Sequence, residues 1–165
     1  MSTVTLYSPN ATFPESLLHK TEPPIGIRIH RDTPIASTQY VLNHGIYTVT
    51  LNQMKSAEIP EHLAGFVKYI SLIYGGKPDE RGTQIIKQIR RSRMVIGVTI
   101  EPATAPPEPA LQLVNTVAAM SQSLVFINGV LLDFNDNLIL APDRTFHRRA
   151  QIDLTLPPKR WWQIW

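Results

Sequence analysis

The chain has 165 residues, of which 43% are hydrophobic and 18% charged, and it contains no cysteine. This length suits one domain, the composition is that of a folded chain, and the missing thiols exclude disulfides, cysteine nucleophiles and cysteine-ligated metal sites. The net charge of +3 is too small to indicate a nucleic-acid-binding protein by itself, so the distribution of charges matters more.

The chain lacks the patterns of secretion and membrane insertion. Residues 1–10 have no basic patch followed by an apolar run, and no stretch approaches the roughly 20 apolar residues of a membrane span. We therefore expect a cytoplasmic protein without membrane contact, folded as a single α+β domain over residues 1–165.

Five prolines punctuate the first forty residues. Each removes a backbone donor and fixes its own φ, so residues 1–40 are predicted to be extended segments joined by loops. Within them, alternating isoleucines predict one clear strand over residues 25–30. The same period of two predicts another strand over residues 45–51.

The apolar period then changes to 3.6, which is typical of helices. A first helix, starting near Pro60 and ending at Gly75-Gly76, and a second, over residues 78–91, are predicted. The expected buried residues of the first helix are Leu63, Phe66, Val67, Ile70 and Ile73, and those of the second are Ile85, Ile86 and Ile89.

A strand, a helix and a strand follow, over residues 94–100, 108–121 and 124–127. The helix is expected to bury Leu111, Val114, Val117 and Ala118. This spacing predicts a right-handed βαβ crossover with two parallel strands.

The dipeptide Asn128-Gly129 separates two apolar runs and predicts a two-residue hairpin turn. A second turn over residues 134–137 leads back through residues 138–140, giving a C-terminal antiparallel meander. We therefore predict a mixed β-sheet with about three helices packed to one side of it. A weaker alternation allows one more strand over residues 151–156.

The sequence does not match the common catalytic and metal-binding patterns. The series Asp133, Asn135 and Asn137 resembles the start of a calcium loop, but Arg144 stands where the bidentate glutamate belongs, so a polar turn is the better interpretation. The five histidines have no metal-binding spacing, and no serine lies in a nucleophile elbow. We expect no metal site, no cofactor and no catalytic residue from these patterns.

Two sets of residues remain as possible sites. At the carboxyl edge of the predicted parallel strands, Glu101 and Asn128, with Arg93 or Asp133, are candidates for a small-ligand or enzyme site, although the loop over residues 103–107 has no glycine to cradle a phosphate. The C-terminal segment, residues 143–165, is basic and aromatic. Its candidate contact residues are Arg160, Trp161, Trp162 and Trp165.

Those tryptophans have three open interpretations: packing in the chain's own core, a protein interface, or stacking on single-stranded nucleic acid. A second basic run, Lys87, Arg90, Arg91 and Arg93, contains no acidic residue and is another place where an acidic partner could bind. Nucleic-acid binding would need this run and the C-terminal segment on one face.

Residues 85–102 (IIKQIRRSRMVIGVTIEP) and 113–140 (LVNTVAAMSQSLVFINGVLLDFNDNLIL) form a series: an arginine-bearing helix, a strand ending in Glu-Pro, a helix and an apolar hairpin with an aspartate turn. This series resembles bacterial conserved proteins of unknown function. The resemblance implies an α+β domain and a bacterial source, and it transfers no catalytic residue. Our leading hypothesis is thus a non-catalytic interaction domain that forms a homo-oligomer or binds a protein partner.

Overall fold

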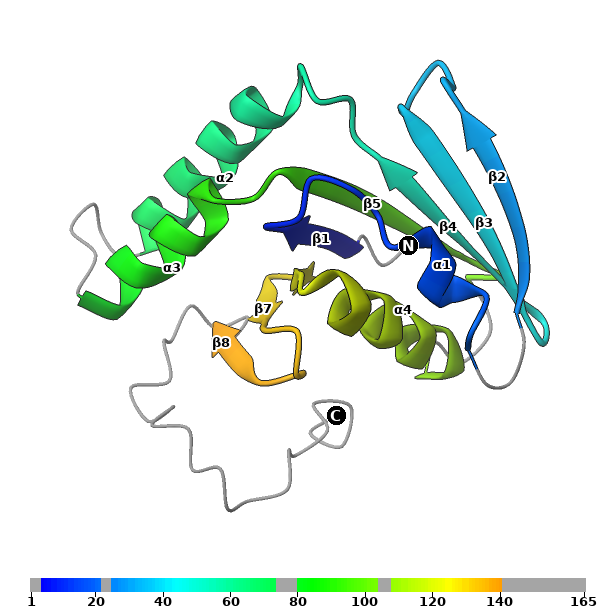
Figure 1. Cartoon of the computed structure of the whole chain (residues 1–165). Coiled ribbons are helices and arrows are strands. Elements are labelled where there is room, and N and C mark those ends of the chain that lie inside the picture. Colours follow the sequence, from blue (N-terminus) through cyan, green and yellow to red (C-terminus); the bar gives the residue numbers. More distant parts are fainter. Residues whose placement is uncertain (1–3, 22–24, 74–79, 104–107, 141–165) are drawn as a thin grey trace.

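The computed structural model of the chain describes residues 4–21, 25–73, 80–103 and 108–140. They contain one eight-stranded sheet with the strand order β2-β3-β4-β5-β1-β6-β7-β8 (Figure 1). The strands are β1 (Val4–Ser8), β2 (Gly26–Arg31), β3 (Thr38–His44), β4 (Tyr47–Gln53), β5 (Met94–Glu101), β6 (Leu124–Ile127), β7 (Val130–Leu132) and β8 (Leu138–Leu140).

The prediction of a mixed sheet is wrong, because every neighbouring pair of these strands is antiparallel. Strands β5 and β6, which sequence spacing paired as parallel neighbours, run in the same direction, but β1 lies between them. Leu6 at the centre of β1 pairs with Ile96 of β5 on one side and with Val125 of β6 on the other. The N-terminal strand thus separates the two strands of the expected crossover.

Four helices accompany the described sheet: α1 (Glu15–Leu18), α2 (Ile59–Ile73), α3 (Glu80–Arg90) and α4 (Glu108–Ser121). The three longer ones confirm the predicted helices. Their predicted apolar stripes are buried wherever the side chains are described. The short α1 and the strand β1 lie within residues 1–40, where the sequence predicted extended segments joined by loops, and β3 begins there. None of the three was predicted as a separate element.

The helices cover both faces of the sheet, so the prediction that they lie to one side is also wrong. Helices α1 and α4 pack on one face, where Leu6 and Ile96 belong to a first core. Helices α2 and α3 pack on the other, where Tyr7 and Val95 belong to a second core. Successive side chains of a strand point to opposite faces, and β1 and β5 carry apolar residues at consecutive positions, so both of their faces need cover.

Strands β2, β3 and β4 are apolar on one face only. Tyr40 and Leu42 of β3 and Val49 of β4 lie in the first core. The alternate residues on the opposite face, such as Asn43 and Thr50, are exposed or half-buried. Antiparallel sheets commonly leave one face in water, and the second core of this sheet is formed mainly around β1, β5, β6, β7 and β8.

The two predicted turns are confirmed. Asn128 and Gly129 have φ values of 49° and 85°, as a two-residue hairpin with positive φ requires, and Ile127 pairs with Val130 across them. In the next turn, the Asp133 carboxylate accepts hydrogen bonds from the backbone N–H groups of Asn135 and Asn137 at 2.8 and 2.9 Å.

None of the helices described here has the length and apolarity to cross a bilayer. Residues 141–165, which include the proposed strand at 151–156 and the basic, aromatic segment, lie outside the described residues.

Candidate functional site

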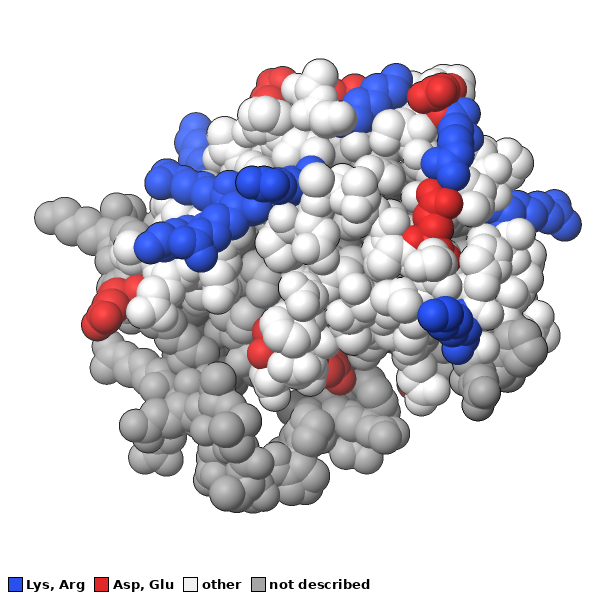
Figure 2. Space-filling model, viewed as in Figure 1, with Lys and Arg blue, Asp and Glu red and all other residues white. Residues whose placement is uncertain are grey.

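Exposed cations without an ion pair among the described residues gather beside the helices α2 and α3. In α3 the helical period directs Ile85 and Ile89 into the second core, which leaves Lys87 exposed on the outside. Arg91, the residue that follows the helix, is exposed as well. Figure 2 shows Lys and Arg side chains gathered over the region that α2 and α3 occupy in Figure 1. The predicted basic run is therefore a surface feature of the last turn of α3 and the residues that follow it.

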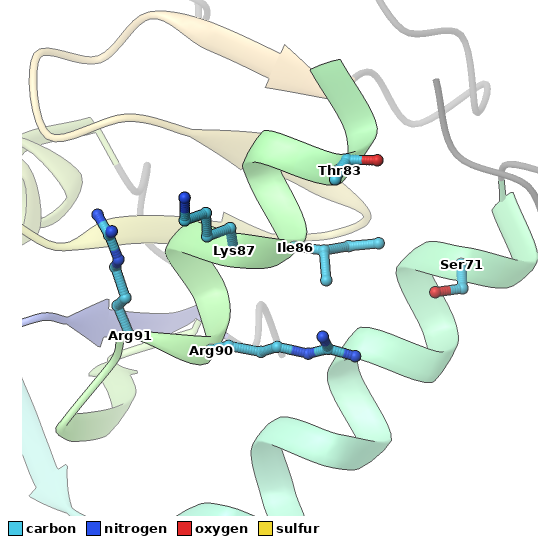
Figure 3. A pocket seen from close by; sticks show the side chains of 6 residues that line it. All are labelled: Ser71, Thr83, Ile86, Lys87, Arg90 and Arg91. Carbon is cyan, nitrogen blue, oxygen red and sulfur yellow. The ribbon is translucent and has the colours of Figure 1, made fainter. Parts of the chain in front are cut away.

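A hollow of about 500 Å³ lies along the seam between the two helices. Figure 3 shows Ile86 and Arg90 extending from α3 toward α2, where Ser71 faces them, whereas Lys87 and Arg91 project to the other side of α3. The lining residues are Ser71 of α2, Thr83, Ile86, Lys87 and Arg90 of α3, and Arg91 directly after it. We call this the basic hollow.

A second hollow, of about 330 Å³, shares Arg90 with the first. Its other lining residues all come from α2 and are apolar: Pro60, Leu63, Ala64 and Val67. We call this the apolar hollow. Because Arg90 lines both, its side chain lies where a basic surface changes to an apolar one along the seam.

The cations of the basic hollow have no ion-pair partner among the described residues. In that part of the chain the one ion pair joins Arg31 to Glu15, with Nη2 3.0 Å from Oε2. The Ser71 hydroxyl donates to the carbonyl of Val67 at 2.8 Å, so it is already used within α2. The guanidinium groups of Arg90 and Arg91 are thus available to carboxylates, which they can bind through two parallel hydrogen bonds.

An aromatic cluster holds α2 to the sheet below this seam. The ring of Tyr7 in β1 stacks on Phe66 of α2 with centroids 4.5 Å apart, and Phe126 of β6 meets Phe66 edge-on at 4.9 Å. The Tyr7 hydroxyl lies 3.1 Å from Nε2 of His62. Burial raises the pKa of Tyr7 and lowers the pKa of His62, so both groups are neutral at pH 7. This packing fixes the position of α2 and so the shape of the seam.

The four residues proposed at the strand edge are not brought together. Glu101 lines a separate hollow of about 400 Å³ with Ile46, Thr48, Pro102 and Ala103, and Asn128 occupies its hairpin turn. Arg93 precedes β5, at the opposite end of that strand from Glu101, and its N–H donates to the Ser8 carbonyl at 2.8 Å. Asp133 lies at that opposite end as well, because it follows β7, and its carboxylate is engaged in the turn.

The sequence singled out Arg90, Arg91 and Lys87 but not their surroundings. It assigned Leu63 and Val67 to a buried stripe, and both are indeed mostly buried while their remaining surface lines the apolar hollow. Periodicity identifies the face of each helix, but it does not say which two helices lie side by side. The seam therefore had no sequence signal of its own.

Across the described ranges, no three His, Asp or Glu side chains gather as metal ligands do. Comparison of the chain with models of protein families, with characterised proteins and with solved structures finds no match. The expected relationship to bacterial conserved proteins over residues 85–140 stays a prediction. The α2–α3 seam is therefore the feature of the chain from which a function can be inferred.

Proposed function

We propose that the chain is a non-catalytic docking domain that binds an acidic segment of a partner protein along the α2–α3 seam. The observation that carries the proposal is the position of Arg90, which lines both the basic and the apolar hollow. An amphipathic segment matches this surface, since its carboxylates would pair with Arg90 and Arg91 while an apolar side chain enters between Leu63 and Val67. Arginine beside apolar pockets is characteristic of the residues that dominate protein interfaces.

The arrangement of the cations favours an extended partner over a small anion. Arg90 extends toward α2, whereas Lys87 and Arg91 project to the other side of α3 (Figure 3). A single phosphate or sulfate could not reach all three cationic groups in this arrangement. A peptide with several carboxylates can contact cations that point in different directions.

On this proposal the chain is a cytoplasmic protein that works when it is bound to a partner protein or to copies of itself. Leu72 and Tyr69 on α2 are 68% and 41% exposed, so α2 offers apolar surface that a partner could cover. Sedimentation velocity of the full chain measures whether it self-associates without a partner. The strand-edge ligand site is not proposed, since Asn128 is not among the residues that line the hollow at Glu101, and Arg93 and Asp133 lie at the opposite end of the strands.

The test uses a fluorescein-labelled helical peptide with glutamates on one side and leucines on the other. Fluorescence anisotropy should show binding that weakens with added salt and falls at least about tenfold in the Arg90→Glu variant, which corresponds to about 1.4 kcal/mol. The matched control is Lys20→Glu, which changes the same charge at an exposed site away from the seam.

Equal binding by Arg90→Glu and the unmodified chain would overturn the proposal. A labelled single-stranded oligonucleotide provides the second arm of the experiment. If the oligonucleotide binds with steep salt dependence and the peptide does not, the basic hollow is a nucleic-acid surface and the docking function is wrong.

A further inference from the structure

The outer edge of β2 is a second place where the described sheet is open. Strand β2 is the first in the strand order, so it pairs with β3 on one side only, and Figure 1 shows no described element beyond it. Its six residues contain no proline and pair with β3 in an unbroken register. By contrast, the β7–β8 pair at the other edge has a register shift between Leu131 and Leu132.

The register shows which backbone groups of β2 point outward. The two-residue turn at Gly45-Ile46 makes His44 and Tyr47 a hydrogen-bonded pair, and such pairs alternate along antiparallel strands. Residues 38, 40, 42 and 44 therefore bond to β4, and residues 39, 41 and 43 bond to β2. Since these last three pair with His30, Arg28 and Gly26, the N–H and C=O groups of Ile27, Ile29 and Arg31 point away from the sheet.

An independent hydrogen bond gives the same result. The N–H of Asp32 donates to the carbonyl of Ser37 at 2.7 Å, which makes these two residues a bonded pair at the end of the hairpin. Counting back by twos from Asp32 again assigns His30, Arg28 and Gly26 to β3. Ile27 and Ile29 thus offer two donors and two acceptors in the spacing that a further antiparallel strand requires.

The two faces of this edge differ in chemistry. Ile27 and Ile29 are half-buried at the rim of the first core, so an added strand could extend that core. Arg28 and His30 are exposed on the open face. Arg31 already binds the Glu15 carboxylate at 3.0 and 3.1 Å, whereas Arg28 has no ion pair among the described residues.

We propose that β2 accepts, by strand addition, an extended segment of a partner protein in which acidic and aliphatic residues alternate. The aliphatic side chains would pack beside Ile27 and Ile29, and the acidic ones would lie beside Arg28 and His30. Strand addition obtains affinity from main-chain hydrogen bonds and specificity from alternate side chains, which is the arrangement this edge provides.

A second copy of the chain fits the edge less well than an acidic strand. Two β2 strands paired about a two-fold axis must keep each side chain on its own face. The register centred on Ile29 then places Arg28 opposite the partner's His30, and the register centred on Arg28 places that residue opposite itself. The register centred on Arg28 brings two like charges together, which is unfavourable across a strand pair, and neither of these two registers gives Arg28 an acidic partner.

The experiment measures binding of a fluorescein-labelled peptide of alternating valine and glutamate by anisotropy. The main variant is Ile29→Pro, which removes an outward N–H and leaves the β2–β3 hydrogen bonds intact, because proline is tolerated where an edge N–H faces solvent. Binding should weaken about tenfold or more. Ile29→Val is the matched control, since it keeps the N–H and most of the side chain, and it should bind as the unmodified chain does.

Two further measurements keep the proposal open to refutation if Ile29→Pro fails to fold. A peptide with N-methylated amides at alternate positions along one edge should lose binding, and Arg28→Glu should reverse the preference toward a valine-lysine peptide. Unchanged binding of the N-methylated peptides, or of a folded Ile29→Pro variant, would overturn strand addition. Self-association that Ile29→Pro abolishes would make a second copy the occupant and refute the acidic partner.

The Arg90→Glu variant separates this inference from the proposed function. It should bind the valine-glutamate peptide as tightly as the unmodified chain, because Arg90 lies on α3 and not beside β2. Failure at one surface thus leaves the other to be judged by its own variants.

Discussion

At the residue scale, the contact between Tyr7 and His62 connects a central strand with the helix that carries the candidate site. The Tyr7 hydroxyl and Nε2 of His62 are 3.1 Å apart, and their rings stack with centroids at 5.8 Å. Burial lowers the pKa of His62. A neutral imidazole can accept a hydrogen bond from the tyrosine O–H at Nε2, and a charged imidazolium cannot. Protonation of His62 therefore opposes the packing of α2 on β1.

This contact predicts a pH-dependent contribution to stability. Because the folded pKa of His62 lies below its unfolded value, the unfolded chain binds the proton more readily, and stability is lost as pH falls below the ordinary histidine pKa of about 6.5. The loss should be under about 1 kcal/mol, since water reaches the half-buried ring. Urea unfolding at neutral and mildly acidic pH should show a smaller loss in His62→Gln, and the exposed His30→Gln variant should behave as the unmodified chain.

The same scale shows what local sequence chemistry could predict. Both turns depend on residues within a few positions of one another, so the local sequence was enough to predict them. They are the positive-φ pair Asn128 and Gly129 and the turn around Asp133. The Tyr7–His62 contact joins residues 55 positions apart. Nothing in either residue's neighbourhood identifies such a partner.

At the element scale, the helices were predictable because an amphipathic stripe is a local pattern. The stripes of α2, α3 and α4 were identified correctly, but the face of the sheet that each helix covers was not. A stripe shows that a helix is half-buried, not against what. The run Met94, Val95 and Ile96, which is buried at consecutive positions, was the available signal that helices cover both faces.

The two-sided arrangement can be tested through α3. Ile89 is fully buried in the second core, so Ile89→Ala should lower the free energy of unfolding by about 2–5 kcal/mol. Leu72 on the neighbouring α2 is 68% exposed, so Leu72→Ala removes mostly solvent-facing surface. This variant should change the free energy of unfolding by less than about 0.5 kcal/mol. Denaturant unfolding measures both, and a tolerated Ile89→Ala would mean that α3 is not docked on the sheet.

At the scale of the whole molecule, the position of β1 decides the topology. The strand is five residues long and comes first in the described chain, yet it pairs with β5 and β6, whose partner residues lie about 90 and 120 positions later. A short strand has little local signal, and pairing over such separations has none. The spacing between β5 and β6 predicted a parallel strand pair. The two strands run in one direction but are not paired, because β1 lies between them, and the intervening strand could not be inferred from that spacing.

This topology predicts a specific order of amide protection. Leu6 and Ile96 lie on strands paired on both sides, so their N–H groups should exchange with solvent only on global unfolding, at an apparent free energy of about 5–15 kcal/mol. In β2 the inward N–H of Arg28 should be protected, whereas the outward N–H of Ile27 and Ile29 should exchange nearly as fast as in an unfolded chain. Hydrogen exchange followed by NMR resolves these amides individually. Equal protection along β2 would mean that its outer edge is already covered, and fast exchange at Leu6 would contradict the central position of β1. Addition of the valine-glutamate peptide should slow exchange at the Ile27 and Ile29 amides selectively, because strand addition gives those two donors their missing acceptors.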